Sequence, residues 1–381
     1  MGERIHSIDS FRAVAISFVV IAHTHPFHAF GPYGSEIYFI LDTIGQFDVP
    51  FFFVAAGYFL AERARPGELK SLLLDSTRKL GSMYLFGTLL FVSVLSVLTV
   101  GAATVYGRSP TNALLTRFPE GFSPAELLYY GNAIAIPMWF LTALLFSIGF
   151  LSAFVAIDRT QYLLPVAAGV HLFGTVGQNF PMLFDVPFPT RDALFFGFFY
   201  LALGFQLRRT DWRPDENHSR LYLGAIGALV VIQVLEQYAV SYLLRGLSFN
   251  QGVFTTEYTV STAFLTLAIF AYALSNPQWG KGTVLPKLGT YAVGIYLVHA
   301  PMYETFEVVS NVTRNVAGIG LRATLLWHVL IAPVVFVLSL VAYVLMARAG
   351  VIEIGRSHVP WLDRLRTRFG ASDSDNGPAA D

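Results

Sequence analysis

An arginine and a histidine, Arg12 and His23, lie eleven residues apart in the first apolar segment of the 381-residue chain. Eleven residues are about three turns of an α-helix, so both side chains project from one face, about 16 Å apart along the axis. This face would carry a permanent cation at one end and an imidazole that can accept a proton at the other. The spacing also fits a plainer interpretation, in which Arg12 reaches toward lipid head groups and His23 marks the far membrane interface.

Polar residues also interrupt the second apolar segment, which contains Asp42, Gln46, Asp48 and Pro50. Asp42 and Gln46 are one helical turn apart, and Pro50 can kink a helix. A carboxylate here, Asp48 or Asp42, could orient the His23 ring by binding its second nitrogen. The alternative interpretation is a polar clamp between helices.

Two adjacent cations, Arg78 and Lys79, open the third apolar segment. Together with the free backbone N–H groups of a helix N-terminus, they would attract an anion. Most such pairs simply follow the excess of positive charge on the inner side of membrane proteins.

Two further residues, Trp139 and His299, stand in the fourth and ninth apolar segments. A Trp at the outer boundary is more often part of an interfacial aromatic belt than a platform for substrate. His299 lies deep in its segment beside Pro301, and a lone buried His is more often structural than catalytic. The sequence has no His-Glu-x-x-His pair, no Gly-Lys-Ser/Thr phosphate loop and no Gly-x-Ser-x-Gly elbow.

The elements that position these residues are membrane-spanning helices. Hydrophobic residues make up 54% of the chain and charged residues 13%, against about 25% charged in a soluble domain. The net charge is zero, so no basic field is available to bind nucleic acid, and the absence of Cys excludes disulfides and thiolate metal sites. We predict an all-α polytopic bundle of about ten spans, since about 20 apolar residues cross the hydrocarbon. The predicted spans are 8–28, 37–60, 80–101, 136–157, 162–178, 193–207, 221–243, 258–275, 288–306 and 324–348.

The distribution of basic residues predicts the orientation. With the N-terminus inside, 19 of the 25 Lys and Arg residues fall on the cytoplasmic side and six on the outer side. Both termini are therefore predicted to be cytoplasmic. Residues 1–350 are predicted to form the membrane domain and 351–381 a cytoplasmic tail, disordered in part. The outer stretch 102–135 is the longest predicted connection.

In this order, the motifs resemble those of the acyltransferase-3 family of multispan membrane acyltransferases, and the resemblance covers roughly residues 5–345. The first helix, from Ile8 to Ala15, is similar to the family's opening, and Arg12 and His23 match its Arg, ten residues, His spacing. The remaining matches are Asp48 to Tyr58, Trp139-Phe140-Leu141 and Leu288 to His299.

The chain departs from the family at two positions. Many relatives have a second Arg three positions after the first at the start of the third helix, where this chain has Gly81, so only Arg78 and Lys79 remain. Some relatives have a Glu five residues after the central Trp, where this chain has Leu144. The sequence therefore resembles the family's Trp-Phe-Leu branch.

The resemblance implies transfer of an acyl group, often acetyl, from cytoplasmic acetyl-CoA or another acyl-CoA to a glycan or related acceptor at the cell surface, without a metal. Arg12, Arg78 and Lys79 would bind the donor phosphates. His23, oriented by Asp48, would act as general base or form an acyl-imidazole, and Trp139 and His299 would contact substrate. The expected location is the plasma or inner membrane, with lipid contacts throughout. The rival hypothesis is a proton-coupled secondary transporter, since broken helices at Pro50 and Pro301 beside buried His and Asp would suit one.

Overall fold

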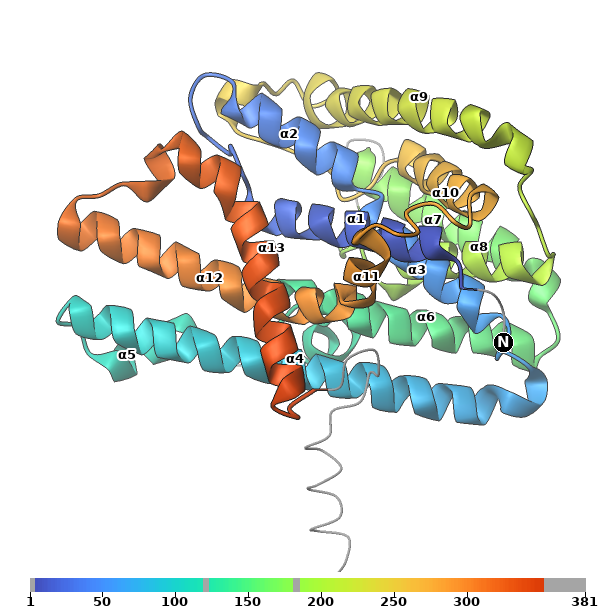
Figure 1. Ribbon diagram of the computed structural model, residues 1–381, viewed down its shortest axis with the longest axis horizontal. Coiled ribbons are helices and arrows are strands. Elements are labelled where there is room, and N and C mark those ends of the chain that lie inside the picture. Colours follow the sequence, from blue (N-terminus) through green and yellow to red (C-terminus); the bar gives the residue numbers. More distant parts are fainter. Residues whose placement is uncertain (1–3, 119–122, 181–185, 353–381) are drawn as a thin grey trace, which may run out of the picture.

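The computed structural model describes residues 4–118, 123–180 and 186–352, and across these residues it is helical without a β-strand (Figure 1). The predicted tail, 351–381, therefore lies almost entirely outside the described residues. The helices are α1 (His6–Thr24), α2 (Gly34–Gly45), α3 (Asp48–Leu60), α4 (Leu69–Val105), α5 (Pro110–Arg117), α6 (Trp139–Ala156), α7 (Leu163–Asn179), α8 (Phe198–Arg209), α9 (Ser219–Tyr238), α10 (Val260–Ser275), α11 (Leu285–Thr290), α12 (Ala292–Ala317) and α13 (Leu325–Arg348).

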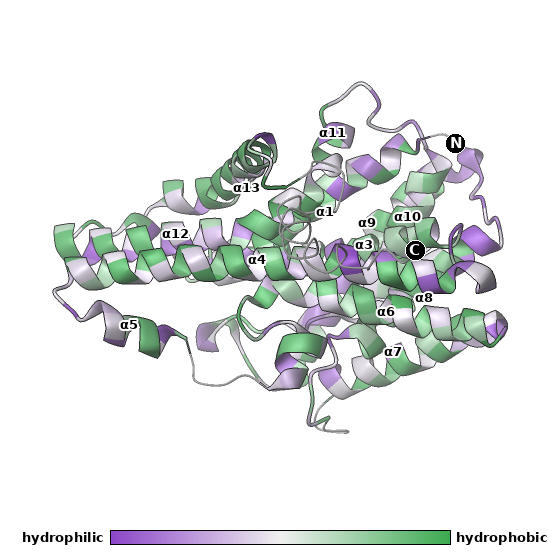
Figure 2. Cartoon of the chain, turned by 90° about the horizontal axis from the view of Figure 1, so that it is seen from below, coloured by the Kyte–Doolittle hydropathy of each residue, from purple (hydrophilic) through white to green (hydrophobic). Residues whose placement is uncertain are grey.

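The distribution of polar and apolar side chains is that of a membrane bundle. Large apolar residues face outward, among them Val97 and Leu326, which are 73% and 67% exposed. Polar residues such as Gln233 and Thr262 are completely buried. Figure 2 shows hydrophobic residues along most of α4 and α13. Lipid solvates an apolar exterior while polar groups pair inside the bundle, so this arrangement fits a multi-pass membrane protein.

The predicted number of spans is met only in part. Six helical stretches among the described residues are long and apolar enough to cross a membrane, and α10 is a shorter apolar helix. The count of about ten is not confirmed, because other predicted spans form shorter helices: α7 has 17 residues and α8 has 12. The six stretches are His6–Thr24, Gly34–Leu60, Pro66–Val105, Ile136–Ala156, Glu216–Leu243 and Leu325–Arg348.

The helix is interrupted close to Pro50, one of the two prolines predicted to break a helix. The second predicted span consists of α2 and α3, which are separated at Gln46 and Phe47. Pro50 lies in the first turn of α3, where its missing N–H has no partner to lose. Pro301 does not end its helix, since α12 continues through it to Ala317.

The third predicted span begins earlier than predicted. Helix α4 starts at Leu69 and has 37 residues, which is about 55 Å of helix and exceeds the hydrocarbon thickness. Arg78 and Lys79 therefore lie in the third turn of α4, away from its N-terminus. The sequence predicts that free backbone N–H groups of a helix N-terminus assist these cations. This prediction is wrong, because the backbone N–H groups near Arg78 and Lys79 bond to carbonyls within the helix.

Helices α3 and α8 approach each other through glycines. A Cβ atom at Gly57 would lie 2.0 Å from the Leu201 carbonyl oxygen, and one at Gly204 would lie 1.9 Å from that of Val54. These distances leave no room for any side chain, so the two backbones are in direct contact. The packing of α3 against α8 therefore holds in place the residues of α3 that face the bundle interior.

The orientation of the chain stays a prediction and is testable by reporter fusions. A fusion at residue 115, in α5, is expected to report the outer side, and one at residue 370 the cytoplasm, because of the bias in basic residues. An alkaline phosphatase and a fluorescent protein reporter at each position would measure this. The same side for both positions would contradict the predicted topology.

Candidate active site

A cavity of about 610 Å³ follows one face of α1. Arg12, Ile16, Val19 and His23 all line it, and their spacings of four, three and four residues keep one helical face turned toward the space. The prediction that Arg12 and His23 share a face is confirmed, and the face they share lines a cavity.

One end of the cavity is charged. Arg12, Arg63, Asp75 and Lys79 line it there. Arg12 donates to the Asp9 carboxylate at 3.0 Å, its guanidinium lies 5.4 Å from the Phe59 ring centre, and Arg63 pairs with Asp75 at 2.7 Å. Three cations against two carboxylates, Asp9 and Asp75, leave this end positively charged, which suits an anionic ligand.

Between this end and His23 the walls are mostly apolar. We call this part the apolar middle of the cavity; it is formed by Ile16, Phe52, Leu80, Met83, Phe140, Leu144 and Ile148. Helix α4 contributes one helical face, made of Asp75, Ser76, Lys79, Leu80 and Met83. Arg78 is exposed and is not part of the lining, so it lies away from the face on which Lys79 projects.

At the other end, the His23 ring is held by its own helix. Nδ1 lies 2.8 Å from the Val19 carbonyl oxygen. A carbonyl oxygen can only accept, so in neutral His23 Nδ1 carries the proton and Nε2 keeps a free lone pair. In the described residues no carboxylate bonds His23; the part expected of Asp48 is taken by a main-chain carbonyl. The ring is thereby set up to accept a proton at Nε2.

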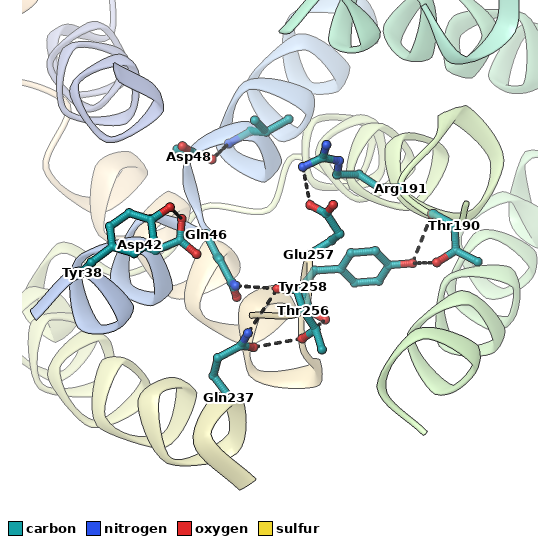
Figure 3. A network of polar contacts seen from close by, with 11 residues as sticks. Tyr38, Asp42, Gln46, Asp48, Thr190, Arg191, Gln237, Thr256, Glu257 and Tyr258 are labelled. Carbon is teal, nitrogen blue, oxygen red and sulfur yellow. Dashed lines mark hydrogen bonds and ion pairs between the residues drawn. The ribbon is translucent and has the colours of Figure 1, made fainter. Parts of the chain in front are cut away.

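Asp48 belongs instead to a polar network beside the cavity (Figure 3). It is buried at the start of α3, where it accepts a hydrogen bond from the Val49 N–H. Tyr38 donates to Asp42 at 3.5 Å, and the Gln46 amide donates to the Thr256 carbonyl at 2.8 Å. Gln46, between α2 and α3, thus joins this region to the segment around Thr256, as in the clamp interpretation, whereas Asp48 accepts its hydrogen bond within its own helix.

Trp139 lines the cavity and packs against an arginine that sequence analysis did not single out. The Arg191 guanidinium lies 4.9 Å from the Trp139 ring centre and forms an ion pair with Glu257 (Figure 3). Such a cation–π contact is favourable when shielded from water. Arg191 also interacts electrostatically with His23 and Asp48, so it belongs to the histidine end of the site.

Arg191 is placed by its neighbour, Asp192. Asp192 is buried, accepts a hydrogen bond from the Phe195 N–H at 2.8 Å and another from the Tyr129 hydroxyl at 2.9 Å. Burial raises the pKa of Asp192. Through this residue the turn at Ala193–Gly197 is tied to the segment around Tyr129, which fixes where the preceding Arg191 projects.

His299 meets His23 directly, although it does not line the cavity. Their ring centres are 4.9 Å apart, with the ring planes at 73°. His299 is fully buried on α12, and its Nδ1 lies 2.7 Å from the Tyr296 carbonyl oxygen. The first and ninth predicted spans therefore bring two imidazoles into contact, which the sequence does not reveal.

The structure thus gathers four of the seven predicted site residues around one space: Arg12, His23, Lys79 and Trp139. Arg78, Asp48 and His299 lie off the lining. Among the described residues no group of three or more His, Asp or Glu side chains is placed to hold a metal ion. The arrangement can accommodate a long ligand, anionic at one end, whose other end reaches a proton acceptor.

A family model described as an acyltransferase domain matches residues 5–346, which is nearly the whole chain. The chain belongs to the acyltransferase-3 family. The resemblance found in its motifs is therefore confirmed. No solved structure matches it.

Curated relatives of the chain include a serine/alanine racemase of Enterococcus gallinarum, 26% identical over 61% of this chain and 34% of the racemase. An amino-acid racemase of Enterococcus faecalis is 32% identical over 54% of this chain and 29% of its own length. The chain spans about a third of the length of these relatives. The match therefore covers only part of each racemase.

Two residues of the site were missed because their sequence neighbourhood is ordinary. Arg63 looks like one of many cytoplasmic basic residues, and Arg191 lies in a loop of no recognisable motif. A usable signal for Arg63 was its position three residues after the end of α3, on the side predicted to hold Arg12. Nothing in the sequence links Arg191 to Trp139, 52 residues earlier.

Proposed function

We propose that this acyltransferase transfers an acyl group, acetyl in the first instance, from cytoplasmic acyl-CoA to a hydroxyl of a cell-surface glycan or related acceptor. The observation that carries the proposal is the cavity along α1, which joins a cationic end to the free Nε2 of His23. The two ends suit opposite ends of a long donor, because Arg12 and His23 are too far apart to touch one small group.

The donor fits this cavity in chemical terms. Its phosphates require cations, which Arg12, Arg63 and Lys79 supply at the end predicted to be cytoplasmic. The thioester arm is less polar and would extend through the apolar middle of the cavity. The thioester carbonyl would then lie beside His23.

A single base is sufficient for every proton transfer in the acyl-transfer reaction. His23 Nε2 takes the proton of the acceptor hydroxyl while the hydroxyl oxygen bonds to the acyl carbon. The carbon–sulfur bond then breaks, and the sulfur takes the proton from Nε2, which yields an ester and a free CoA thiol. Incubating the protein with acetyl-CoA alone, followed by intact mass measurement, distinguishes this route from an acyl-imidazole, since only the latter leaves acyl on the enzyme.

The acceptor would approach from the histidine end of the cavity, the end predicted to face outward, where Arg191 contacts Trp139 and Glu257. Aromatic faces and charged hydrogen-bonding groups are the usual means of holding a sugar ring and its hydroxyls. This arrangement supports a hydroxyl-rich acceptor, and the expected location is the plasma or inner membrane.

The direct test is mass spectrometry of surface glycans and lipids from cells with and without the protein. We expect a mass difference of one acyl group on the acceptor, and purified protein in lipid discs should consume acetyl-CoA when that acceptor is added. Uphill movement of a solute into vesicles without a covalent product would instead support the transporter hypothesis.

The donor end gives a separate prediction with a built-in control. Lys79→Ala should weaken CoA binding by about 1.5–3 kcal/mol, the size of a hydrogen bond to a charged group, because Lys79 lines the cavity. Arg78→Ala, one residue away and off the lining, should weaken it less. Calorimetry on both purified variants measures this, and an equal or larger loss for Arg78→Ala would contradict the donor position.

A further inference from the structure

His299 has a buried nitrogen without a hydrogen-bond partner. Its side chain is 0% exposed, and Nε2 has no partner, while Nδ1 donates to the Tyr296 carbonyl at 2.7 Å. Leaving such an atom unpaired is unfavourable, so most buried polar atoms in proteins have a partner. The neutral ring thus presents a free lone pair within the protein interior.

The His23 ring lies against this histidine. The ring centres are 4.9 Å apart and the planes are nearly perpendicular, so the edge of one ring meets the other ring. Both rings carry their proton on Nδ1, so in the resting protein two lone pairs are present and no proton lies between the rings. The contact becomes more favourable when one ring acquires a positive charge.

We infer that His299 is a positioning residue that stabilises the protonated form of His23 during acyl transfer, through its otherwise unpartnered Nε2 lone pair. This inference rests on the proposed function. When His23 takes the acceptor proton, the charge on its ring is partly balanced by this lone pair. The proton itself stays on His23 until sulfur takes it, and His299 neither gains nor loses one.

The charges around His23 are consistent with a need for such stabilisation of its protonated form. Among the described residues, Arg191 and His25 interact electrostatically with His23, in addition to its contact with His299. Neither contributes a negative charge, so neither offsets an imidazolium. The His299 lone pair can do so, whereas the Val19 carbonyl is already bonded to Nδ1 in the resting state.

The chain supplies a matched control, His171. It too is buried, donates from Nδ1 to a backbone carbonyl, that of Phe195 at 2.8 Å, and has an unpartnered Nε2. Its ring is stacked between Phe199 and Tyr258, with ring centres 4.4 and 5.1 Å away. It has the same burial and bonding as His299 without the contact to His23.

The test compares His299→Asn, His299→Gln and His171→Asn in purified protein with acetyl-CoA and acceptor. Asn keeps a donor near the Nδ1 position and has no atom at Nε2, whereas Gln places an amide there. We expect His299→Asn to lower kcat by on the order of tenfold to a hundredfold, with the acetyl-CoA KM unchanged. His299→Gln should recover part of this loss, and His171→Asn should leave kcat near that of the wild type.

The pH dependence provides the second readout. Since His299 favours protonated His23, its loss should move the acid limb of the kcat profile to lower pH. An unchanged kcat in a folded His299→Asn protein, or an equal loss of kcat in His171→Asn, overturns this inference and leaves the proposed function standing. If the wild type consumes no thioester, the proposed function itself fails.

A measurement on the wild type covers the case in which the variants do not fold. In ¹⁵N-histidine NMR, the His299 Nε2 resonance should stay in the unprotonated range and shift as His23 titrates. A resonance that does not respond to His23 overturns the inference.

Discussion

Replacing His23 by Ala is expected to lower the rate of acyl transfer by about 10²–10⁴-fold, the usual contribution of a general base. His23 lines the cavity, and its Nε2 is the nitrogen left free by the bond to Val19. CoA affinity should persist, because the cationic end lies about 16 Å away along the same helix. Turnover and CoA binding measured on the same preparation separate the two effects.

His171→Ala is the control for this experiment, since it removes a buried imidazole outside the site. It should reduce stability with little effect on turnover per folded molecule. Normal turnover in the His23→Ala protein would remove His23 from the catalytic role, even though the family membership would stand. Activity of the wild type should also fall as pH is lowered, because a protonated imidazole cannot accept a proton.

Replacing Gly204 by Ala is expected to destabilise the bundle by on the order of 3 kcal/mol or more. The added Cβ would lie 1.9 Å from the Val54 carbonyl oxygen, and a backbone atom cannot move aside as a side chain can. Helices α3 and α8 would have to separate. Thermal unfolding of detergent-solubilised protein, followed by circular dichroism or fluorescence, measures the loss.

Gly149→Ala on α6 is the matched control, because a Cβ there meets nothing within 4 Å. Ala is the better helix former by about 1 kcal/mol, so this variant should be as stable as the wild type or slightly more so. If both variants melt alike, the close contact between α3 and α8 does not contribute as described.

Helical periodicity made the main feature of the site predictable. The shared face of Arg12 and His23 depends only on their spacing within one continuous helix, and the structure confirms it. The same logic fails where the element itself was misjudged: α4 begins at Leu69, so Arg78 and Lys79 are interior residues that project in different directions. An apolar window locates the hydrocarbon-crossing part of a helix and misses polar turns that extend beyond it.

Contacts between distant segments were beyond such reasoning. Asp48 was expected at His23 because both were polar residues in neighbouring spans, yet the nearer Val19 carbonyl satisfies Nδ1. A helix offers this acceptor four residues back along the chain, which needs no tertiary partner. The approach of His299 to His23, and of Arg191 to Trp139, depends on how α1, α6 and α12 pack, which periodicity does not specify.

The apolar middle of the cavity has an electrical consequence. A water-filled path from the charged end past His23 would let protons or ions cross, driven by about 2.3 kcal/mol per elementary charge for each 100 mV of membrane potential. Hydrophobic constrictions resist this because water leaves them readily, and ions do not enter without water. Side chains such as Phe52, Phe140 and Leu144 line this part and would insulate the empty site. A cell can then keep such a cavity inside its membrane without ions leaking through it and lowering the membrane potential.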